Sequence, residues 1–566
     1  MRKILTILLL AVSLTSWGTR VYVATTGNDG TGDGTVGAPY LTIATGITNA
    51  SAGDTVYVVA GTYSITAEVS VPVGISIMGA GSATTIINST YRSAAFSSGF
   101  NNGTFLLSSV SQGTAGNQSI SHLTFDGGDG DASGSTNAIM IKNRGAVLVH
   151  DCIIRDFDWT GVTFTNGTTL TAPTTYAYGN KLYNCTITNC SGQAGTWEGC
   201  GLVSVNGQDN LDIYNCIFYG DQRAEGDNGD IIASHGQGFN KRLQYHNNIS
   251  YKPDYDGAAW NFHLELFNCY GGSNIYDNEF HGGDCQIDIT GMYGNTKTDQ
   301  AYTYRIYNNL FTGVPVETDH GKPTIDIEGD LNEDIYIYNN HFLNLPVPIS
   351  TTDNTYAPSQ TRRIYIYYNI FENMGWNDAA KYETCININN WNAGSVMDNI
   401  HIYNNVMESD GVTHTAAFKI AGASTISNLM IKNNIITGHT NGAYMLIDND
   451  GTIDSLHIVN NLIYGSSNSN NVLWQTVGDT TNVINTGAIK SDPLFKSSTD
   501  LHLQPTSPAR DAGIDVSAIT GGLDYHGASL YGAAYDIGAF EYGVGRMINI
   551  GTMIPTINYK IVLIDH

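Results

Sequence analysis

Basic residues are scarce in this chain of 566 residues. Its 25 Lys and Arg residues stand against 51 Asp and Glu residues, which gives a formal net charge of −26. A chain with this charge repels nucleic acid and anionic membrane surfaces, so nucleic-acid binding is disfavoured. An anionic glycan would meet the same repulsion unless a metal ion or a local basic pocket intervened.

Long apolar runs are also lacking beyond the N-terminus. Met1, Arg2 and Lys3 precede an apolar run over residues 4–12 and a small polar stretch over 13–18, which is the order of a secretory signal. The alternative is a buried first strand. No later stretch approaches the roughly 20 apolar residues of a membrane span. We expect a signal peptide at 1–18 and a secreted or cell-surface protein, extracellular or periplasmic, without membrane insertion.

Charged residues of both signs make up only 13% of the chain, and there are only 13 Pro, against 63 Gly and 34 Tyr. Gly and Tyr are poor helix formers, so the composition favours strands and tight turns. This predicts an all-β protein.

One sequence pattern recurs between residues 120 and 463. Apolar residues alternate with polar or aromatic ones, then Asn-Asn or Asp-Cys follows, then apolar residues resume, as in LDIYNCIF (211–218) and IYIYNNHF (335–342). The second residue of each pair recurs about every 31 residues, a spacing typical of a solenoid. These second residues are Cys152, Cys185, Cys216, Asn248, Asn278, Asn309, Asn340, Asn369, Asn405, Asn434 and Asn461.

The alternation breaks at the first residue of each pair, which is Asn or Asp in nearly every repeat. Such residues tolerate a positive φ, so the chain is expected to bend there, with two short strands meeting at a corner. Coils stacked about 4.8 Å apart would place the second residues above one another, and their amides could form a hydrogen-bonded ladder. Cys152, Cys185 and Cys216 would then be small packing residues rather than disulfide or metal partners.

Two aromatic columns follow from the same repeat. Phe residues two positions after the corner are expected inside the solenoid, and Tyr residues two positions before it are expected outside. The Tyr column could be a platform for sugar stacking or a wall stiffened by Tyr-on-Tyr contacts.

These repeats resemble the pectate-lyase-like right-handed β-helix superfamily. The segment YVATTGNDGTGDGTVGAPYLTIATGITNASAGDTVYVVAGTY (22–63) is similar to an N-terminal cap of secreted polysaccharide lyases, and DPLFKSSTDLHLQPTSPARDAG (492–513) with YDIGAFEY (535–542) resembles the closing segment of exported bacterial β-helix proteins. The resemblance implies a single-stranded right-handed parallel β-helix of about 12 coils. We expect a cap and first coils at 19–119, the β-helix at 120–490, a closing segment at 491–545 and a tail at 546–566.

Charge gathers in one stretch of the repeats, since residues 221–330 hold 24 of the 76 charged residues. There the strands FHLELF (262–267), QIDI (286–289) and TIDIEGD (324–330), followed one coil later by CININN (385–390), alternate apolar and polar residues. Glu265, Asp288, Asp326 and Asn387 should therefore point out of one face at neighbouring heights, flanked by His263 and Glu328.

Carboxylates on adjacent rungs repel each other, which leaves three explanations. They could bind Ca²⁺, one could keep its proton for general acid catalysis, or solvent alone could screen them. The acid-rich loops 221–230 and 252–257 could also ligate metal or be solvated.

The resemblance to alginate lyases and chondroitinases of this fold implies Ca²⁺ beside a substrate carboxylate, held here by Glu265, Asp288 and Asp326, with a Lys as base and an Arg assisting. The candidate catalytic residues are Lys241, Arg242, Lys252, His263 and Arg305. Candidate substrate-binding residues are His235, Glu328 and Asn387. Ser234-His235-Gly236 is similar to the Gly-His-Gly turn of pectin hydrolases, but their paired Asp is lacking, which disfavours an inverting hydrolase.

Two functions remain open. The first is a polysaccharide lyase acting on an acidic glycan, and the second is a non-catalytic glycan-binding adhesin or a fibre like a phage tailspike. The protein would be a monomer or a homotrimer, and residues 546–566, with apolar 561–564, could serve in assembly or be a frayed end.

Overall fold

In the computed structural model the described residues are 18–92, 102–128, 137–167, 172–190, 201–220, 230–234, 238–252, 262–269, 271–283, 285–291, 303–313, 323–329, 331–352, 360–374, 384–390, 395–409, 417–422, 425–439, 445–465, 474–529 and 532–543. The predicted signal peptide and the tail at 546–566 lie outside them. Within this part of the chain, no helix is long and apolar enough to cross a membrane.

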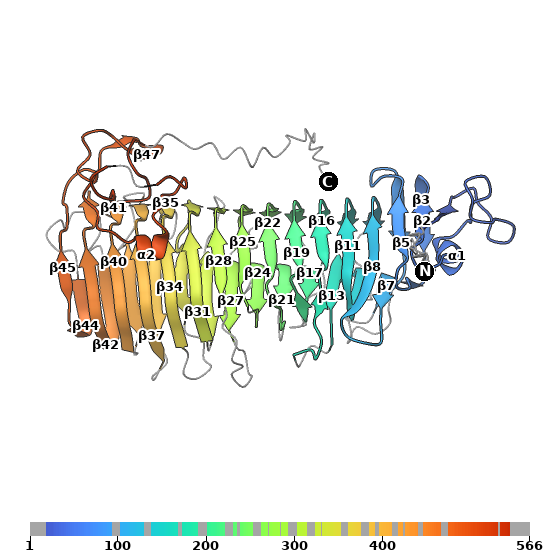
Figure 1. Ribbon diagram of the computed structural model, residues 1–566, viewed down its shortest axis with the longest axis horizontal. Helices are drawn as coiled ribbons and strands as arrows, with labels where there is room; N and C mark the ends of the chain where they lie inside the picture. Colours follow the sequence, from blue (N-terminus) through green and yellow to red (C-terminus); the bar gives the residue numbers. More distant parts are fainter. Residues whose placement is uncertain are drawn as a thin grey trace, which may run out of the picture.

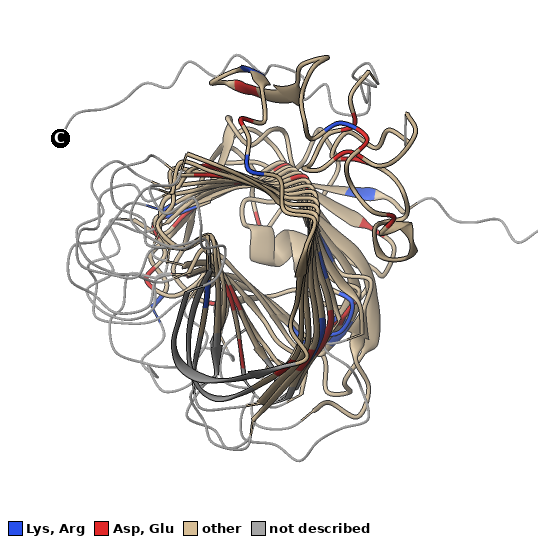
Figure 2. Ribbon diagram, turned by 90° about the vertical axis from the view of Figure 1, so that its left-hand side faces the viewer, with Lys and Arg blue, Asp and Glu red and all other residues tan. Residues whose placement is uncertain are grey.

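The chain is a right-handed parallel β-helix whose coils stack along one long axis (Figure 1). Seen along that axis, successive coils superpose (Figure 2). Each full coil contributes a strand to each of three columns, which we number in the order in which the chain visits them. A 29-stranded sheet holds the first and second columns, joined through β42, and a 14-stranded sheet is the third. The predicted fold class is confirmed.

The first column contains β4 (Val69–Ser70), β7 (Gly103–Ser108), β10 (Asn137–Lys142), β13 (Val162–Thr165), β17 (Gly201–Val205), β21 (Asp230–Ser234), β24 (Phe262–Phe267), β27 (Cys285–Gly291), β30 (Ile325–Gly329), β33 (Ile349–Thr352), β36 (Ile386–Asn390), β39 (Phe418–Gly422), β42 (Met445–Val459) and β44 (Trp474–Thr481).

The second column contains β1 (Arg20–Val23), β2 (Thr55–Val58), β5 (Ser76–Gly79), β8 (Thr114–Ser121), β11 (Arg144–His150), β15 (Lys181–Tyr183), β19 (Asp212–Tyr214), β22 (Gln244–His246), β25 (Ser273–Tyr276), β28 (Tyr304–Tyr307), β31 (Leu331–Tyr338), β34 (Gln360–Tyr367), β37 (Val396–Tyr403), β40 (Thr425–Lys432), the later part of β42, and β45 (Ile484–Thr486).

The third column contains β3 (Gly61–Ile65), β6 (Thr85–Ser89), β9 (Thr124–Asp126), β12 (Ile153–Arg155), β16 (Thr186–Thr188), β20 (Ile217–Tyr219), β23 (Ile249–Tyr251), β26 (Glu279–His281), β29 (Leu310–Thr312), β32 (His341–Leu343), β35 (Ile370–Met374), β38 (Val406–Ser409), β41 (Ile435–Thr437) and β43 (Leu462–Tyr464). The strands from β9 to β43 correspond to the twelve predicted coils.

The bend between the second and third columns lies where the repeat predicts it. The first residue of each pair has a φ between 50° and 56°, from Asp151 to Asn460. Tyr368 occupies this position in one coil with a φ of 52°, a conformation that is unusual for a bulky side chain. The parity break in the sequence therefore marks a real corner.

The predicted amide ladder is also present. From Asn248 to Asn461, each second-position side chain donates through Nδ2 to the Oδ1 of the next one at 2.9–3.2 Å. Cys152, Cys185 and Cys216 continue this column as free, buried thiols, and the backbone N–H of Cys216 donates to Asn248 Oδ1 at 2.9 Å. These three cysteines are packing residues, as predicted.

Aromatic rings stack on both sides of the corner. Phe280, Phe311, Phe342 and Phe371 are fully buried, with successive ring centroids 4.9–5.0 Å apart. The outer Tyr column stacks in the same way, with Tyr276 and Tyr307 5.0 Å apart and nearly parallel. Since the ring faces cover each other, the Tyr column is a stiffened wall rather than a sugar platform.

The two ends of the solenoid are covered differently. At the first coils, α1 (Ile43–Thr48) places Ile43 and Ile47 in the main core cluster. The closing segment, with β46 (Phe495–Ser497), β47 (Asp500–Leu503) and α2 (Ser517–Thr520), lies beside the last coils, near β35 and β41 (Figure 1). There Ile537 and Phe540 pack against outward-facing apolar residues of the third column, including Val406 and Ile435. A small separate sheet pairs β14 (Ala177–Tyr178) with β18 (Gln208–Asp209).

Candidate functional site

Three acidic residues share the outer face of the first column on successive strands. Glu265 of β24 pairs in register with Asp288 of β27, which pairs with Asp326 of β30. Their apolar neighbours in the strands, such as Leu264 and Ile287, lie in the core cluster. Because side chains alternate along a strand, the three carboxyls point the other way and stand above one another. The predicted alignment is confirmed, and we call this set the carboxyl column.

The outward-facing positions continue beyond Asp326, and one more strand lies between Asp326 and Asn387 than the sequence predicted. Asp326 pairs with Ser350 of β33, and Ser350 pairs with Asn387 of β36. Asn387 therefore lies two coils after Asp326, and the prediction of one coil is wrong, because β33 carries no acidic residue that would mark it. The next rung is Lys419 of β39, whose side chain is buried.

Two members of the carboxyl column, Glu265 and Asp288, are shielded from water, while Asp326 is half-buried. Glu265 is 6% exposed and Asp288 only 3% exposed, so solvation alone does not screen their charges. Burial raises the pKa of Glu265 well above its ordinary value, and the nearby Asp230 and Asp288 raise it further. Burial also raises the pKa of Asp288 well above its ordinary value, with additional repulsion from Glu328 and Asp326. One or more of these carboxyls must be protonated or paired with a cation at neutral pH.

Asp230 is a member of this site that sequence reasoning did not single out. It begins β21, and its Oδ1 accepts a hydrogen bond from the backbone N–H of Phe262 at 3.1 Å. Burial raises its pKa to about 6, although the charge of Lys252 and a hydrogen bond with Glu265 oppose the shift. Asp230 ends the acid-rich loop 221–230, so the only signal was its membership of that loop, whose other residues lie outside the described part of the chain.

Thr290 joins two rungs of the site. Its Oγ1 lies 3.2 Å from Asp288 Oδ2 and 3.1 Å from Glu328 Oε1, and Thr290 and Glu328 are register partners. A hydroxyl donates only one proton, so both contacts are hydrogen bonds only if one carboxyl carries a proton of its own. This geometry agrees with the raised pKa of Asp288. It also places Glu328, a predicted substrate-binding residue, at the edge of the carboxyl column.

Lys252 is the predicted catalytic residue that lies beside the acids. It follows β23, its side chain is only 4% exposed, and its positive charge lowers the pKa of Asp230. The same charge, together with burial, lowers the pKa of His263 to about 3. An ammonium group thus sits next to the acidic end of the site.

His263 does not face outward. Its side chain is fully buried, its ring lies edge-on to Phe280 with centroids 5.6 Å apart, and its nitrogens contact Ser250 Oγ at 2.7 Å and the Gly282 carbonyl at 2.8 Å. A neutral imidazole with both nitrogens engaged fills the corner between columns. The predicted position flanking the acids on the outer face is wrong, because the His263 ring turns toward Ser250 and Phe280 of the third column.

Three other predicted catalytic residues lie along the second column, away from the acids. Lys241 sits over the Tyr176 ring at 3.9 Å, and burial lowers its pKa. Arg242 forms a bidentate pair with Asp209 at 2.7 and 2.8 Å. Arg305 of β28 lies over the Tyr336 ring at 5.5 Å. The expectation that these residues assist the carboxyl column is wrong, because all three lie along the second column and the acids lie on the first. His235 lies outside the described residues.

A second polar cluster lies where the closing segment meets the last coils. His502 Nδ1 contacts Asp500 Oδ1 at 2.5 Å, and His502 Nε2 lies 3.0 Å from His526 Nε2. Across a hollow of about 580 Å³, His341 Nε2 contacts Glu372 Oε2 at 2.9 Å. Sequence reasoning missed this cluster, because no repeat relates the closing segment to the coils.

No family model matches the chain, and no curated protein matches it. Among solved structures, the chain is similar to the catalytic unit of a thermostable GH87 alpha-1,3-glucanase from Streptomyces thermodiastaticus strain HF3-3, at 13% identity over 79% of this chain and 65% of that one, with a TM-score of 0.42. It therefore spans just under two thirds of that protein.

The chain is also similar to two further solved structures. The A-module of the Azotobacter vinelandii mannuronan C-5 epimerase AlgE4 is 11% identical over 77% of this chain and 88% of that one, with a TM-score of 0.32. XylC in complex with xylose is 10% identical over 92% of this chain and 98% of that one, with a TM-score of 0.34. At these values the likeness is one of fold alone.

Proposed function

We propose that this chain is a secreted enzyme of the polysaccharide-lyase type, which cleaves an acidic glycan along the outer face of β24, β27, β30, β33 and β36. The observation that carries the proposal is the carboxyl column, in which Glu265 and Asp288 are buried on adjacent rungs. A solenoid needs no buried stack of like charges for stability, since each such pair costs about 1 to 3 kcal/mol. Such a cost is typical of a functional site.

The donor atoms of the column suit Ca²⁺. Glu265, Asp288 and Asp326 offer carboxylate oxygens at rungs about 4.8 Å apart, and Ca²⁺ prefers oxygen ligands at about 2.3–2.6 Å. Bound there, Ca²⁺ would neutralise a carboxylate of the glycan and so make the proton on the adjacent carbon more acidic. It would also remove the repulsion that this negatively charged chain otherwise presents to an acidic substrate.

The remaining polar residues of the face can orient the sugar. Asn387 has a buried Oδ1 with no hydrogen-bond partner among the described residues, so a sugar hydroxyl can donate to it. Ser350 lies on the rung between Asn387 and the acids. Glu328 stands at the opposite edge, beside Thr290. These side chains span several rungs, which matches the extended shape of a polysaccharide.

Lys252 is the proposed base. A lyase needs a base that is neutral when it takes the proton next to the substrate carboxylate. Lys252 is buried, which favours the neutral amine, while the neighbouring Asp230 favours the charged form.

Hydrolysis is the second candidate, and one observation favours it. Burial and mutual repulsion raise the pKa values of Glu265 and Asp288 well above their ordinary values, so one of them can stay protonated at neutral pH and act as a general acid on the glycosidic oxygen. A third outcome, binding without cleavage, corresponds to an adhesin or a fibre.

The test is product analysis on alginate, pectate and chondroitin, with Ca²⁺ or with a chelator. The lyase predicts ultraviolet absorbance from an unsaturated sugar, dependent on Ca²⁺ and lost in E265Q. New reducing ends without absorbance would replace the lyase with a hydrolase. Bound glycan with neither signal would contradict both enzymes and support the adhesin.

A further inference from the structure

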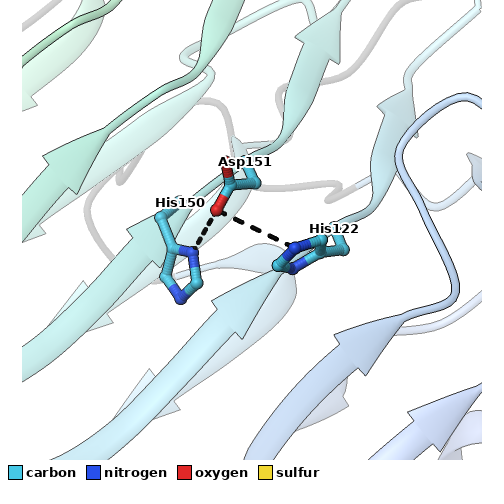
Figure 3. A group of neighbouring side chains, drawn as sticks. All are labelled: His122, His150 and Asp151. Atoms are coloured by element: carbon cyan, nitrogen blue, oxygen red, sulfur yellow. Dashed lines mark hydrogen bonds and ion pairs between the residues drawn. The ribbon is translucent and has the colours of Figure 1, made fainter.

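Two histidines and an aspartate meet on the outside of the corner in the early coils. His122 lies between β8 and β9. One coil later, His150 ends β11 and Asp151 follows it (Figure 3). His150 Nδ1 lies 2.7 Å from Asp151 Oδ2, and His122 Nε2 lies 3.9 Å from the same oxygen. One ligand atom from each residue falls within 4.8 Å of the other two.

These atoms suit a transition-metal ion. Zn²⁺ binds imidazole nitrogen at about 2.0–2.1 Å and carboxylate oxygen at about 2.0–2.2 Å, so neighbouring ligand atoms around a tetrahedral ion lie about 3.3 Å apart. The observed separations of 2.7 and 3.9 Å bracket that value, and small rotations of the side chains reach it. The side chains of His122 and Asp151 are 36% and 37% exposed, so water can complete the coordination.

Neighbouring groups hold two of the ligands in place. The ring of His150 stacks on Tyr183, with centroids 4.7 Å apart and planes within 4°. Asn184 Nδ2 donates to Asp151 Oδ1 at 3.3 Å, which leaves Oδ2 facing the two imidazoles. Hydrogen bonds and contacts that orient ligands in this way are a general feature of metal sites.

The repeat supplies a comparison within the same chain. His246 and Asn247 occupy the same corner two coils after Tyr183, and His246 Nδ1 lies 2.8 Å from Asn247 Oδ1. There the corner residue is an amide, and the coil before it carries Asn215 instead of a histidine. Among the described corners of this kind, His122 and Asp151 are the one case in which a histidine lies one coil before a carboxylate. The grouping of His122, His150 and Asp151 is therefore specific to this corner and does not arise from the repeat.

We propose that His122, His150 and Asp151 form a site for a divalent transition-metal ion that bridges two successive coils. Zn²⁺ is the first ion to test. The site is separate from the carboxyl column and does not depend on the proposed enzymatic function. Because the ligands come from two coils, the ion stabilises the stacking of the N-terminal coils whenever it binds the folded state better than the unfolded one.

The experiment is a titration of the full chain with Zn²⁺ in excess Mg²⁺, followed by calorimetry, and with Co²⁺, followed by visible absorbance. Three variants remove one ligand each by borrowing a residue that this chain uses at the equivalent position: H122N and D151N install the corner Asn, and H150Y installs the Tyr of the stacked column. D277N is the matched control, because it makes the same change as D151N at a corner where Asn247 and Tyr276 take the places of His122 and His150.

The proposal predicts one Zn²⁺ per wild-type chain, tetrahedral Co²⁺ absorbance, and an affinity at least tenfold lower in all three variants but unchanged in D277N. Circular dichroism confirms that the variants are folded. No Zn²⁺ binding by the wild type, or equal binding by the wild type, H122N and D151N, would overturn it.

Discussion

Glu265 and Asp288 are direct register partners on β24 and β27, so the chain holds two buried carboxyls on adjacent rungs of one face. Asp288 raises the pKa of Glu265, while Glu328 and Asp326 raise the pKa of Asp288. Lys252 and Asp230 flank the same end of the site. The predictions below test how this stack of acids is stabilised and what it does.

The first prediction concerns pH and stability in D288N. The pKa of Asp288 is raised in the folded state, so its stabilising effect is complete below the ordinary value of 3.8 and is lost as pH rises through the raised pKa. Above that range the wild type carries a buried repulsion that the amide lacks. D288N should gain about 1 to 3 kcal/mol over the wild type as pH rises above about 4, without Ca²⁺.

Unfolding in guanidinium at a series of pH values measures this difference, with D277N as the control for a half-buried corner carboxylate. A D288N effect that stays constant across the pH range would show that repulsion at this rung is absent.

Ca²⁺ should make the wild type more stable than D288N. If the carboxyl column binds Ca²⁺, saturation at about 100 times the Kd adds about 2.7 kcal/mol to the wild type and much less to D288N or D326N. Thermal unfolding with Ca²⁺, Mg²⁺ or chelator measures the shift. Equal shifts in all variants would place the ion elsewhere on this acidic chain.

Lys252 and Arg305 should differ sharply in their effect on turnover. Lys252 lies beside the acids, whereas Arg305 lies over a tyrosine ring on another column. K252M should lower kcat by about 100-fold or more, the usual loss for a general base, and R305M should leave it within about twofold. Initial rates on the best substrate decide this. Similar rates for K252M and the wild type would show that Lys252 takes no part in the reaction.

The amide ladder should be a major source of stability. Asn309 Nδ2 donates to the Ile275 carbonyl and to Asn340 Oδ1, both inside the core. N309A leaves buried partners unsatisfied and should lower the free energy of unfolding by about 1 to 3 kcal/mol. N309C should lose less, because Cys216 fills the same column with its Sγ near the Leu182 carbonyl at 3.7 Å. Chemical denaturation compares the two variants, and equal losses would contradict a special fit of Cys in the ladder.

The corner could be predicted from sequence because it is local. An Asn or Asp that breaks the alternation reports a positive φ at that residue, and the equal spacing of the second residues reports the stacking. The same alternation placed Glu265, Asp288 and Asp326 on one face, since the strand that carries each of them is unbroken there.

The rest of the site depends on loops and corners of variable length. The sequence around Lys241, Arg242 and Arg305 does not report which side chains of the first column lie near each of them. The strand pattern also did not report that the His263 ring contacts Ser250 and Phe280 of the third column. Ser350 was missed because its short strand has no acid, and His122 because a histidine at a corner has no repeat to match. Contacts between side chains of different columns depend on the path of the chain through the whole coil, and local sequence patterns do not encode that path.

The most direct test of the central claim is the initial rate of D326N on the polysaccharide that the wild type cleaves, compared with D277N. Both variants change one carboxylate to an amide, but only Asp326 lies on the carboxyl column. We predict that D326N falls by about 100-fold while D277N keeps the wild-type rate. Equal rates in the two variants would mean that cleavage, if it occurs, happens elsewhere on the molecule.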